Sequence, residues 1–254
     1  MSKRISLITV TYQSAETLKD TIESVRRQSF GDMEYIVVDG GSTDETLDIL
    51  KKNDDVVNHW ISEPDNGIYD AMNKGIGMAN GEVIGFLHAD DIFARSEVIE
   101  NIVDRYLASG FHLLYGDLEY VSADNPEKVI RYWRSGSFRR QQLQRGWMPP
   151  HPTVYVSRDF FAQIGAFNTE YRISADYEWL LRALSFPSIK VEYLPEVLVR
   201  MRLGGASNKS LRNVIAKSGE DLRALRYHRV GGLGGFRTLF WKNASKISQF
   251  VRRN

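Results

Sequence analysis

Residues 5–46 read ISLITVTYQSAETLKDTIESVRRQSFGDMEYIVVDGGSTDET, and the order of patterns in this stretch decides the fold. Ile5–Thr11 is a short run of apolar and β-branched residues, which predicts a buried strand. Apolar residues then recur at helical spacing across residues 15–28. A second apolar run, Tyr35–Val38, ends at Asp39. A strand, a helix and a strand in this order predict a βαβ unit of a parallel sheet.

The same alternation continues through the first half of the chain. The predicted elements are a helix that starts at a capping box of Ser42 and Glu45, a strand near His59–Ser62, a helix from Ile68 to Ala79 that Gly81 ends, a strand at Val83–Leu87, a helix with Val98, Ile102 and Tyr106 in step, and a strand at Leu113–Val121. We therefore expect an α/β fold with a mostly parallel sheet flanked by helices. Between Asn125 and Pro152 the pattern is lost, and we expect an insertion or a flexible loop there.

Length and composition exclude several classes of protein. The chain has 254 residues, 43% of them hydrophobic, so we expect a single domain with a C-terminal appendage. Because 33 Lys and Arg nearly balance 32 Asp and Glu, the net charge gives no reason to expect a nucleic-acid partner. The absence of cysteine excludes thiol catalysis, disulfides and cysteine-bound zinc, and it fits the cytoplasm. No secretory leader or run of 18 apolar residues is found, so any membrane association is expected to be peripheral.

Two of the predicted strands end in acidic residues. Asp39 opens the turn DGGSTDET, and Asp90 and Asp91 follow the strand in GFLHADD. Ligands of open α/β sheets bind at the carboxyl ends of the strands, so these acids suit a nucleotide base at one strand and a metal-bound diphosphate at the other. The alternatives are that Asp39 is a turn residue and that Asp90 and Asp91 belong to a helix N-cap.

The motifs ITVTYQS, DGGSTDET, SEPDNGIYDAMNKGI, HADD and SADYEWLLR, in this order, resemble those of the family 2 glycosyltransferases. The resemblance covers about the first 200 positions, and SEPDNGIYDAMNKGI is similar to bacterial enzymes that build exopolysaccharide and colanic-acid-type repeat units. It implies the GT-A fold and transfer of a sugar from a nucleotide-sugar, with UDP as the first expectation and GDP as the second. The implied acceptor is a saccharide carried on a lipid such as polyprenyl diphosphate.

The resemblance also implies roles for particular residues. It assigns the binding of the nucleotide-sugar to seven residues. Thr9 and Tyr12 are expected to lie beside the nucleotide, and Asp39 is expected to contact its base. Asp65, Asn73 and Lys74 are expected near the nucleotide-sugar, and Asp90 is expected to hold the metal. The family usually has Asp-x-Asp at the metal turn, whereas this chain has His88-Ala89-Asp90.

The acidic turn has a chemical explanation. A nucleoside diphosphate leaves readily only when its developing charge is neutralised, and Mg²⁺ or Mn²⁺ held by one or two carboxylates does this. Histidine is less suited to such hard cations, so His88 is either a ligand, a support behind the ligands or a core residue.

The motif SADYEWLLR supplies the expected catalytic residue. Ser174 is expected to cap a helix whose first turn contains Asp176, where the positive helix end favours an ionised carboxylate. Complementing the helix dipole is the alternative role for Asp176. The resemblance implies that Asp176 is the general base of an inverting displacement, with Glu178 pointing elsewhere on the helix.

Several other residues are secondary candidates. They are His88, Asp91, His151 near the acceptor or diphosphate, and Arg202 and Ser207 in a loop that can close over the diphosphate. A run of basic and aromatic residues is either a solvated loop or a site for acceptor phosphates: Arg131, Trp133, Arg134, Arg139, Arg140, Arg145 and Trp147.

We expect the chain to be divided into a catalytic domain at 1–210 and a helical segment at 211–254. Within the domain, residues 1–122 are expected to bind the donor and 123–210 the acceptor. Residues 236–253 combine aromatic and aliphatic side chains with Arg237, Lys242 and further cations, which predicts either an interfacial helix on the membrane's inner face or a helix packed on protein. The oligomeric state is not predicted.

The expected function is therefore an inverting, metal-dependent glycosyltransferase of cell-surface polysaccharide synthesis. The rival is an inactive scaffold of the same fold that binds nucleotides or carbohydrates. A nicotinamide-dependent oxidoreductase is disfavoured, because Thr11-Tyr12-Gln13-Ser14 stands where GxGxxG would follow the first strand. A processive synthase is disfavoured because no QxxRW motif follows Asp176.

Overall fold

The computed structural model describes residues 4–203, 211–231 and 233–242. The chain forms two compact units, each built from segments that are distant in the sequence. The first unit comprises Met1–Gly136, Pro149–Phe167 and Lys190–Gly205, and the second comprises Ser137–Met148, Asn168–Ile189 and Ala206–Asn254. Each unit is described separately below.

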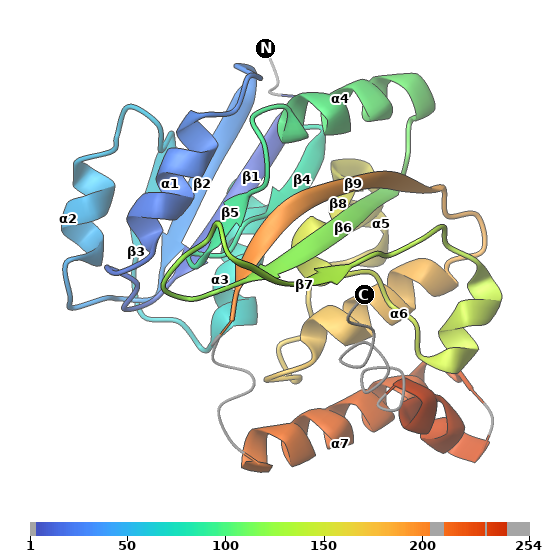
Figure 1. The fold of residues 1–254 in the computed structure, drawn as a ribbon. Helices are drawn as coiled ribbons and strands as arrows, with labels where there is room; N and C mark the ends of the chain where they lie inside the picture. The colour runs from blue at the N-terminus through green and yellow to red at the C-terminus, as the bar shows by residue number, and fades with distance from the viewer. Residues whose placement is uncertain (1–3, 204–210, 232, 243–254) are drawn as a thin grey trace. The chain divides into compact units, whose positions relative to one another are not determined.

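The first unit begins with the expected βαβ unit (Figure 1). It consists of β1 (Ile5–Thr11), α1 (Leu18–Arg26) and β2 (Met33–Asp39), followed by α2 (Thr46–Lys51) and β3 (His59–Ser62). β2 pairs in parallel with both β1 and β3. All seven residues of β1 are buried, which explains why its sequence is a continuous apolar run without alternation.

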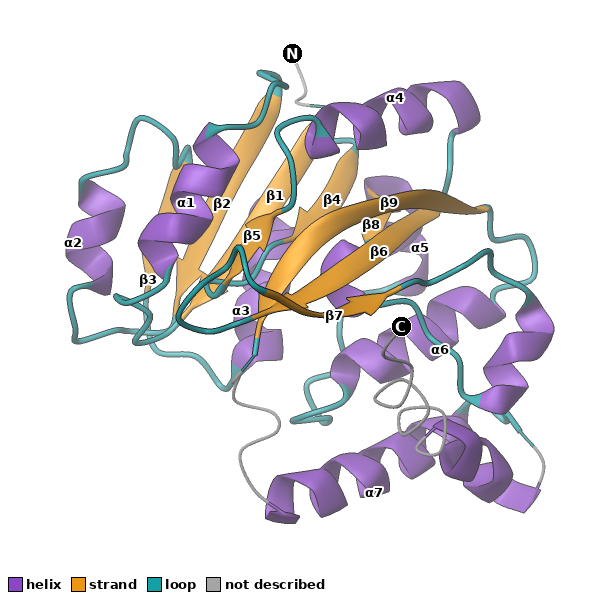
Figure 2. Ribbon diagram, viewed as in Figure 1, coloured by secondary structure: helices purple, strands orange, loops and turns teal. Residues whose placement is uncertain are grey.

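The two faces of β1 pack on different helices. Ile5 and Leu7 belong to the same buried cluster as Leu18 and Ile22 of α1. On the other face Ile8 meets α3 (Ile68–Met78), where a Cβ atom added to Gly75 would lie 2.5 Å from an Ile8 methyl carbon. Figure 2 shows the consequence, with helices on both faces of the sheet. The predicted α/β architecture is confirmed.

The second half of this unit mixes strand directions. Its elements are β4 (Val83–Phe86), β5 (Asp91–Phe93), α4 (Val98–Ser109), β6 (Leu113–Val121), β7 (Val129–Trp133), the short 3-10 turn η2 (His151–Thr153), β8 (Tyr155–Ser157), α5 (Arg158–Ile164) and β9 (Val191–Arg202). The strand order is β3-β2-β1-β4-β8-β6-β9-β5, with β7 paired to β6. β1–β4 and β6–β9 are parallel pairs, whereas β4–β8, β6–β8, β5–β9 and β6–β7 are antiparallel.

Some local predictions differ from the structure. The capping box is not formed, because α2 begins at Thr46 and Ser42 bonds to Asp39 instead. α3 ends at Met78, one residue before the expected end at Ala79, and the close approach of Gly81 to the Ser6 backbone leaves no room for a side chain there. Residues 125–152, expected to be an insertion or a flexible loop, contain β7, the 3-10 helix η1 (Arg140–Arg145) and the start of η2.

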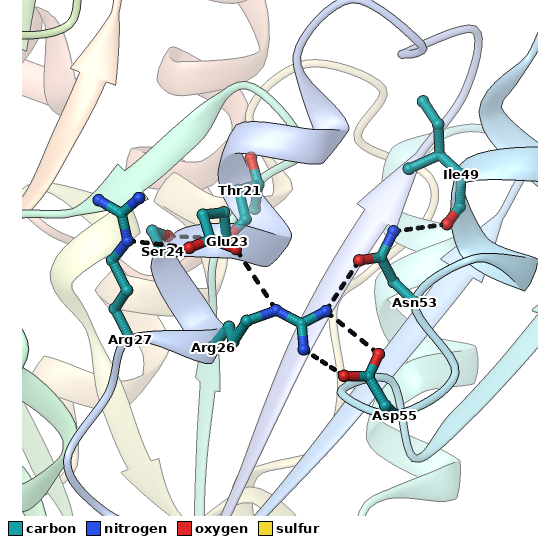
Figure 3. A network of polar contacts seen from close by, with 8 residues as sticks. All are labelled: Thr21, Glu23, Ser24, Arg26, Arg27, Ile49, Asn53 and Asp55. Carbon is teal, nitrogen blue, oxygen red and sulfur yellow. Dashed lines mark hydrogen bonds and ion pairs between the residues drawn. The ribbon is translucent and has the colours of Figure 1, made fainter.

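Surface ion pairs join α1 to the turn after α2 (Figure 3). The Arg26 guanidinium pairs with Asp55 and donates to the Asn53 side-chain oxygen at 3.0 Å, while Glu23 lies 3.4 Å from the Arg26 Nε. The pairing with Asp55 raises the pKa of Arg26 and lowers that of Asp55. Both side chains are exposed, so this network contributes little to stability.

The second unit is helical. It contains η1 (Arg140–Arg145), α6 (Ala175–Ser185), α7 (Leu211–Tyr227), η4 (Leu233–Gly235) and a helical stretch at 236–242. Eight of the eleven residues of α6 are buried, among them Trp179, Leu180 and Leu184, so the helix is covered on most of its sides. Among the helices that the structure describes, none is both long and apolar enough to cross a membrane.

The start of the C-terminal segment differs in one respect from the expected interfacial helix. Phe236, Phe240 and Trp241 are 56%, 67% and 49% exposed, as such a helix requires. Lys242, expected among the exposed cations, is instead buried and lies 2.6 Å from an Asp221 carboxylate oxygen. That assignment of Lys242 is wrong. Residues 243–254 lie outside the described part of the chain.

Candidate active site

Four parallel strands of the first unit end at one edge of the sheet. β3, β2, β1 and β4 are neighbours in this order, and parallel strands bring their carboxyl ends together. Tyr12 follows β1, Asp39 ends β2, and Asp65 and Asp90 follow β3 and β4. The two acidic strand ends noted in the sequence therefore share an edge, separated by β1.

The side chain of Gln13 joins the loops that follow β1 and β2. Its amide oxygen accepts the Asp44 backbone N–H at 3.1 Å, and its amide nitrogen donates to the Thr43 hydroxyl at 2.9 Å. The Gln13 backbone N–H also donates to the Ser42 hydroxyl at 2.8 Å. These bonds hold Gln13 at φ 51°, a left-handed conformation uncommon for a residue with a side chain. The neighbouring Tyr12 side chain is left 61% exposed.

Asp39 is buried and uses its carboxylate to fold its own turn. One oxygen accepts the backbone N–H groups of Gly41 and Ser42 at 3.1 and 2.8 Å and the Ser62 hydroxyl at 2.6 Å. The other oxygen accepts the Ser42 hydroxyl at 2.5 Å. The turn role is therefore observed, and contact with a nucleotide base stays a prediction.

Tyr12 and Asp65 flank the backbone of Gly40. A Cβ atom at Gly40 would lie 2.5 Å from an Asp65 carboxylate oxygen and 3.4 Å from a Tyr12 ring carbon. The other Asp65 oxygen accepts the Gly67 backbone N–H at 2.8 Å. An exposed ring beside a carboxylate can stack on a planar ligand while the carboxylate accepts a hydrogen bond from it.

Lys74 lies among acids on the polar face of α3. Its ammonium is 2.7 Å from a Glu63 oxygen and 3.8 Å from an Asp70 oxygen, and it donates to the Pro64 carbonyl at 3.3 Å. The hydrogen bond with Glu63 raises the pKa of Lys74 against the opposing effect of burial, and the charges of Asp70 and Asp65 add to the rise. Lys74 is therefore a protonated cation close to Asp65.

Two other residues expected to contact the nucleotide-sugar, Thr9 and Asn73, make hydrogen bonds within the fold. The buried Thr9 hydroxyl donates to the Leu87 carbonyl at 2.6 Å and lies 3.0 Å from the Tyr35 hydroxyl. The Asn73 amide group donates to and accepts from the Phe167 backbone, both at 2.9 Å. Direct contact of Thr9 or Asn73 with the donor stays a prediction, and for Thr9 the geometry favours support of the strand ends.

The acidic turn after β4 brings the two candidate histidines together. The ring centres of His88 and His151 are 5.7 Å apart, and His151 also packs against Phe86 and Phe167 at 6.1 Å each. Asp90 is partly exposed at this turn.

Asp91 begins β5 and is not at a helix N-cap, so that alternative is wrong. It is fully buried, and neither carboxylate oxygen has a hydrogen-bond partner within the described chain. Burial raises the pKa of Asp91 well above its ordinary value, the charge of Asp90 raises it further, and Arg202 opposes the rise. Arg202 is the last residue of β9, buried, and hydrogen-bonded to Asp20. Ser207 lies outside the described residues.

The acidic turn suits a hard cation that takes most of its ligands from phosphate. Within the described ranges, no three side chains of the types that bind metals are close enough to form a complete site. Mg²⁺ is typically held by one or two carboxylates together with substrate phosphates, and Asp90 supplies a partly exposed carboxylate of this kind. The residues present therefore fit a divalent cation that arrives with a diphosphate.

Asp176 lies in the first turn of α6, in the second unit, as the sequence predicts. Ser174 occupies the N-cap position, but its hydroxyl makes no capping hydrogen bond, so that part of the prediction is wrong. The carboxylate of Glu220 on α7 instead accepts the backbone N–H groups of Arg172, Ile173 and Ser174, at 3.0, 2.9 and 2.9 Å. No local pattern in the sequence indicates this contact, because its partners are 46 to 48 residues apart.

The body of α6 is fixed by a second polar contact. Glu178 is buried, lies 2.7 Å from His228 Nε2 and accepts a hydrogen bond from Arg182 at 3.1 Å. Burial raises the pKa of Glu178, but the His228 hydrogen bond and the Arg182 charge outweigh it, and the pKa lies below its ordinary value. Glu178 thus has a structural role, consistent with its expected direction away from the chemistry.

The run of basic residues is divided between the two units. Arg131 packs over the rings of Tyr120 and Trp133 in the first unit, at 4.8 and 5.7 Å. Arg140 belongs to the second unit and donates to the carbonyls of Phe186 and Pro187 at the end of α6. Binding of acceptor phosphates by the remaining arginines stays a prediction.

The comparisons with known proteins agree with this architecture. The family model described as Glycosyl transferase family 2 matches residues 6–162. A PGL/p-HBAD biosynthesis glycosyltransferase from Mycobacterium bovis (strain BCG / Pasteur 1173P2) is 32% identical over 213 residues, which cover 80% of this chain and 78% of the relative. An uncharacterized glycosyltransferase from Mycobacterium tuberculosis (strain CDC 1551 / Oshkosh) is 33% identical over 181 residues, or 70% and 68% of the two chains.

Solved structures share the fold at low sequence identity. S. aureus TarS 1-349 in complex with UDP-GlcNAc has a TM-score of 0.69 and 17% identity, and the match covers 89% of this chain and 66% of that one. The mannosyltransferase PcManGT from Pyrobaculum calidifontis, in complex with GDP-Man and Mn²⁺, has a TM-score of 0.60 and 15% identity, with 100% and 77% coverage. The motifs, the sheet and these relatives lead to one conclusion: the chain belongs to glycosyl transferase family 2 and has the GT-A fold of these glycosyltransferases.

Proposed function

We propose that the chain is an inverting glycosyltransferase that moves one sugar from a nucleotide-sugar to a saccharide acceptor. The observation that carries this proposal is the sheet edge where Tyr12, Asp39, Asp65 and Asp90 follow neighbouring parallel strands. We propose a UDP-sugar as donor, with a GDP-sugar as the second choice. The TarS complex with UDP-GlcNAc and the PcManGT complex with GDP-Man support these two classes.

In the proposed donor site, the exposed Tyr12 ring stacks on the nucleotide base and the turn held by Asp39 lines the base. Asp65 and Lys74 lie toward the sugar and the phosphates. Asp90 would hold Mg²⁺ or Mn²⁺, and that cation supplies the positive charge that stabilises the leaving diphosphate. The PcManGT complex with Mn²⁺ supports this choice of metal.

We assign Asp176 the role of general base. Its carboxylate accepts the proton of an acceptor hydroxyl while that oxygen forms a bond to the anomeric carbon. The bond from the anomeric carbon to the diphosphate oxygen breaks on the opposite face, so the configuration inverts. The position of Asp176 at the positive end of α6 favours the ionised carboxylate that this step needs.

Calorimetric titration with UDP, GDP and CDP, each with and without Mn²⁺, tests the donor site. We expect UDP to bind most tightly and Asp90→Ala to abolish the effect of Mn²⁺. In contrast, Asp176→Asn should bind UDP normally and lose transfer. NMR of the product made by the wild type should show that the configuration at the anomeric carbon is inverted. Tight binding with no turnover of any sugar-nucleotide would favour the inactive scaffold instead.

We further propose that the enzyme works in the cytoplasm, at the inner face of the membrane, on a lipid-linked acceptor of cell-surface polysaccharide synthesis. The exposed Phe236, Phe240 and Trp241 support membrane contact, because exposed aromatic side chains next to cations are typical of interfacial helices. Joint replacement of Phe240 and Trp241 by alanine should reduce sedimentation with anionic vesicles. Leu107→Ala, which removes an equally exposed apolar side chain from α4, is the matched control. Unchanged sedimentation of the double variant would remove the membrane role.

A further inference from the structure

Residues 170–174, immediately before α6, are held by two side chains of α7. Glu220 accepts the three consecutive backbone N–H groups of Arg172, Ile173 and Ser174. One turn further along α7, Arg223 donates to the Glu170 carbonyl at 2.9 Å, and its guanidinium lies 3.9 Å from the centre of the Tyr171 ring. Helix α7 therefore fixes both ends of residues 170–174, the segment that leads into α6.

The carboxylate of Glu220 replaces a local cap. The Ser174 hydroxyl is buried and makes no hydrogen bond within the described residues, so the start of α6 does not cap itself through this side chain. Three convergent amide groups bind an anion well, and here a carboxylate from a distant helix takes that place. Because Asp176 is two residues beyond the last of these amides, its main-chain position depends on the same contact.

We infer that Glu220 is a positioning residue for Asp176, and this inference rests on the proposed role of Asp176 as the base. Glu220 fixes the backbone of Arg172–Ser174 and thereby the direction in which the first turn of α6 presents its carboxylate. Displacement of a catalytic group by about 1 Å can reduce the rate roughly 100-fold, so a contact of this kind affects turnover more than donor affinity.

The geometry also predicts a graded response to substitution. In Glu220→Gln one oxygen can still accept the N–H groups of Ile173 and Ser174, while the amide NH₂ faces the N–H of Arg172. Glu220→Ala loses all three bonds. We therefore expect kcat to fall by about 10- to 100-fold in the alanine variant and by less in the glutamine variant. The donor KM and the Kd for UDP should stay within about twofold of the wild type in both, because removing an interaction made only in the transition state lowers kcat without changing ground-state binding.

A double-mutant cycle with Asp176→Asn separates positioning from general damage. If Glu220 acts through Asp176, Glu220→Ala should cause no further loss of kcat in the Asp176→Asn background. Thr238→Val is the control for stability, because Thr238 is buried in the same unit and its hydroxyl donates to the Gln144 carbonyl at 2.7 Å. We expect that control to lower Tm while keeping kcat at temperatures below the transition.

Three results would overturn the inference, and they can be distinguished. An equal fold-loss from Glu220→Ala with and without Asp176 would indicate a merely structural effect. Normal kcat in Glu220→Ala, with Asp176→Asn inactive, would reject the positioning role and leave the proposed function intact. Full turnover in Asp176→Asn would reject the base itself, and the inference would fall with it.

Discussion

Thr9, Tyr12 and Gln13 illustrate how three residues of one strand and its loop acquire different roles. Thr9 is buried and bonded to Leu87 and Tyr35, whereas Tyr12 is just past the end of β1 and mostly exposed. The loops joined through Gln13 hold the exposed ring over the edge of the sheet. An aromatic side chain left in water at this edge is available to a planar ligand.

We predict that Tyr12→Ala weakens donor binding without weakening the fold. Stacking of an aromatic side chain on a nucleotide base contributes about 1–3 kcal/mol, so the Kd for UDP should rise roughly 5- to 150-fold. Tyr12→Phe should bind UDP nearly as well as the wild type. Calorimetry measures both, and thermal unfolding should show an unchanged Tm. An unaltered Kd in the alanine variant would remove Tyr12 from the nucleotide site.

At this scale the sequence predicts residue types better than their contacts. The acids Asp39, Asp65 and Asp90 do follow neighbouring strands, because strand ends can be read from apolar runs. The partner of Asn73 could not be predicted, since Phe167 is 94 residues away and presents only its backbone. The direction of the Thr9 side chain was equally hidden, because a strand buried on both faces has no alternation to show which way each residue points.

Helix α6 depends on elements that follow it in the chain. Its entry is held by Glu220, and its body is held by the contact between Glu178 and His228. The periodic pattern predicts the helix itself, but side-chain contacts between α6 and α7 leave no local signal. β7 was missed for a related reason: its residues are partly or fully exposed, so it lacks the apolar run of a buried strand.

The contact between Glu178 and His228 predicts a dependence of stability on pH. Because the native pKa of Glu178 lies below the ordinary value of 4.5, the carboxylate stabilises the fold fully above pH 4.5. This stabilisation is lost as pH falls through the lowered native pKa. In urea unfolding, Glu178→Gln should be less stable than the wild type at pH 7, by about 1.5–3 kcal/mol.

The difference between the two proteins should shrink as pH falls below 4.5, because the wild type then loses the same interaction. Glu170→Gln is the control, since Glu170 is an exposed acid of the same unit and should leave the pH profile unchanged. A constant gap between Glu178→Gln and the wild type from pH 7 to pH 3 would contradict this assignment.

At the scale of the whole molecule, the order of motifs in the sequence predicts the family, and the family predicts the fold. Neither indicates that each compact unit is built from three segments that are distant in the sequence. The sequence also leaves open which sugar is transferred, since the same fold serves many donors and acceptors.

We predict that a chain ending at residue 205 retains donor binding and loses the structure around α6. Without the residues after 205, the buried side chains of Tyr177 and Glu178 lose their partners Lys242 and His228. Limited proteolysis should then cut within residues 168–189, while the Kd for UDP stays within a few-fold of the wild type. Protection of that segment in the shortened chain would contradict the dependence of α6 on α7.

The late position of Glu220, His228 and Lys242 has a consequence for synthesis on the ribosome. The strands next to Tyr12, Asp39 and Asp90 are translated before α6, and the supports of α6 are translated after it. Under the proposed function, a nonsense codon between those for Asp176 and Glu220 would yield a product that contains the donor site and lacks the supports of α6.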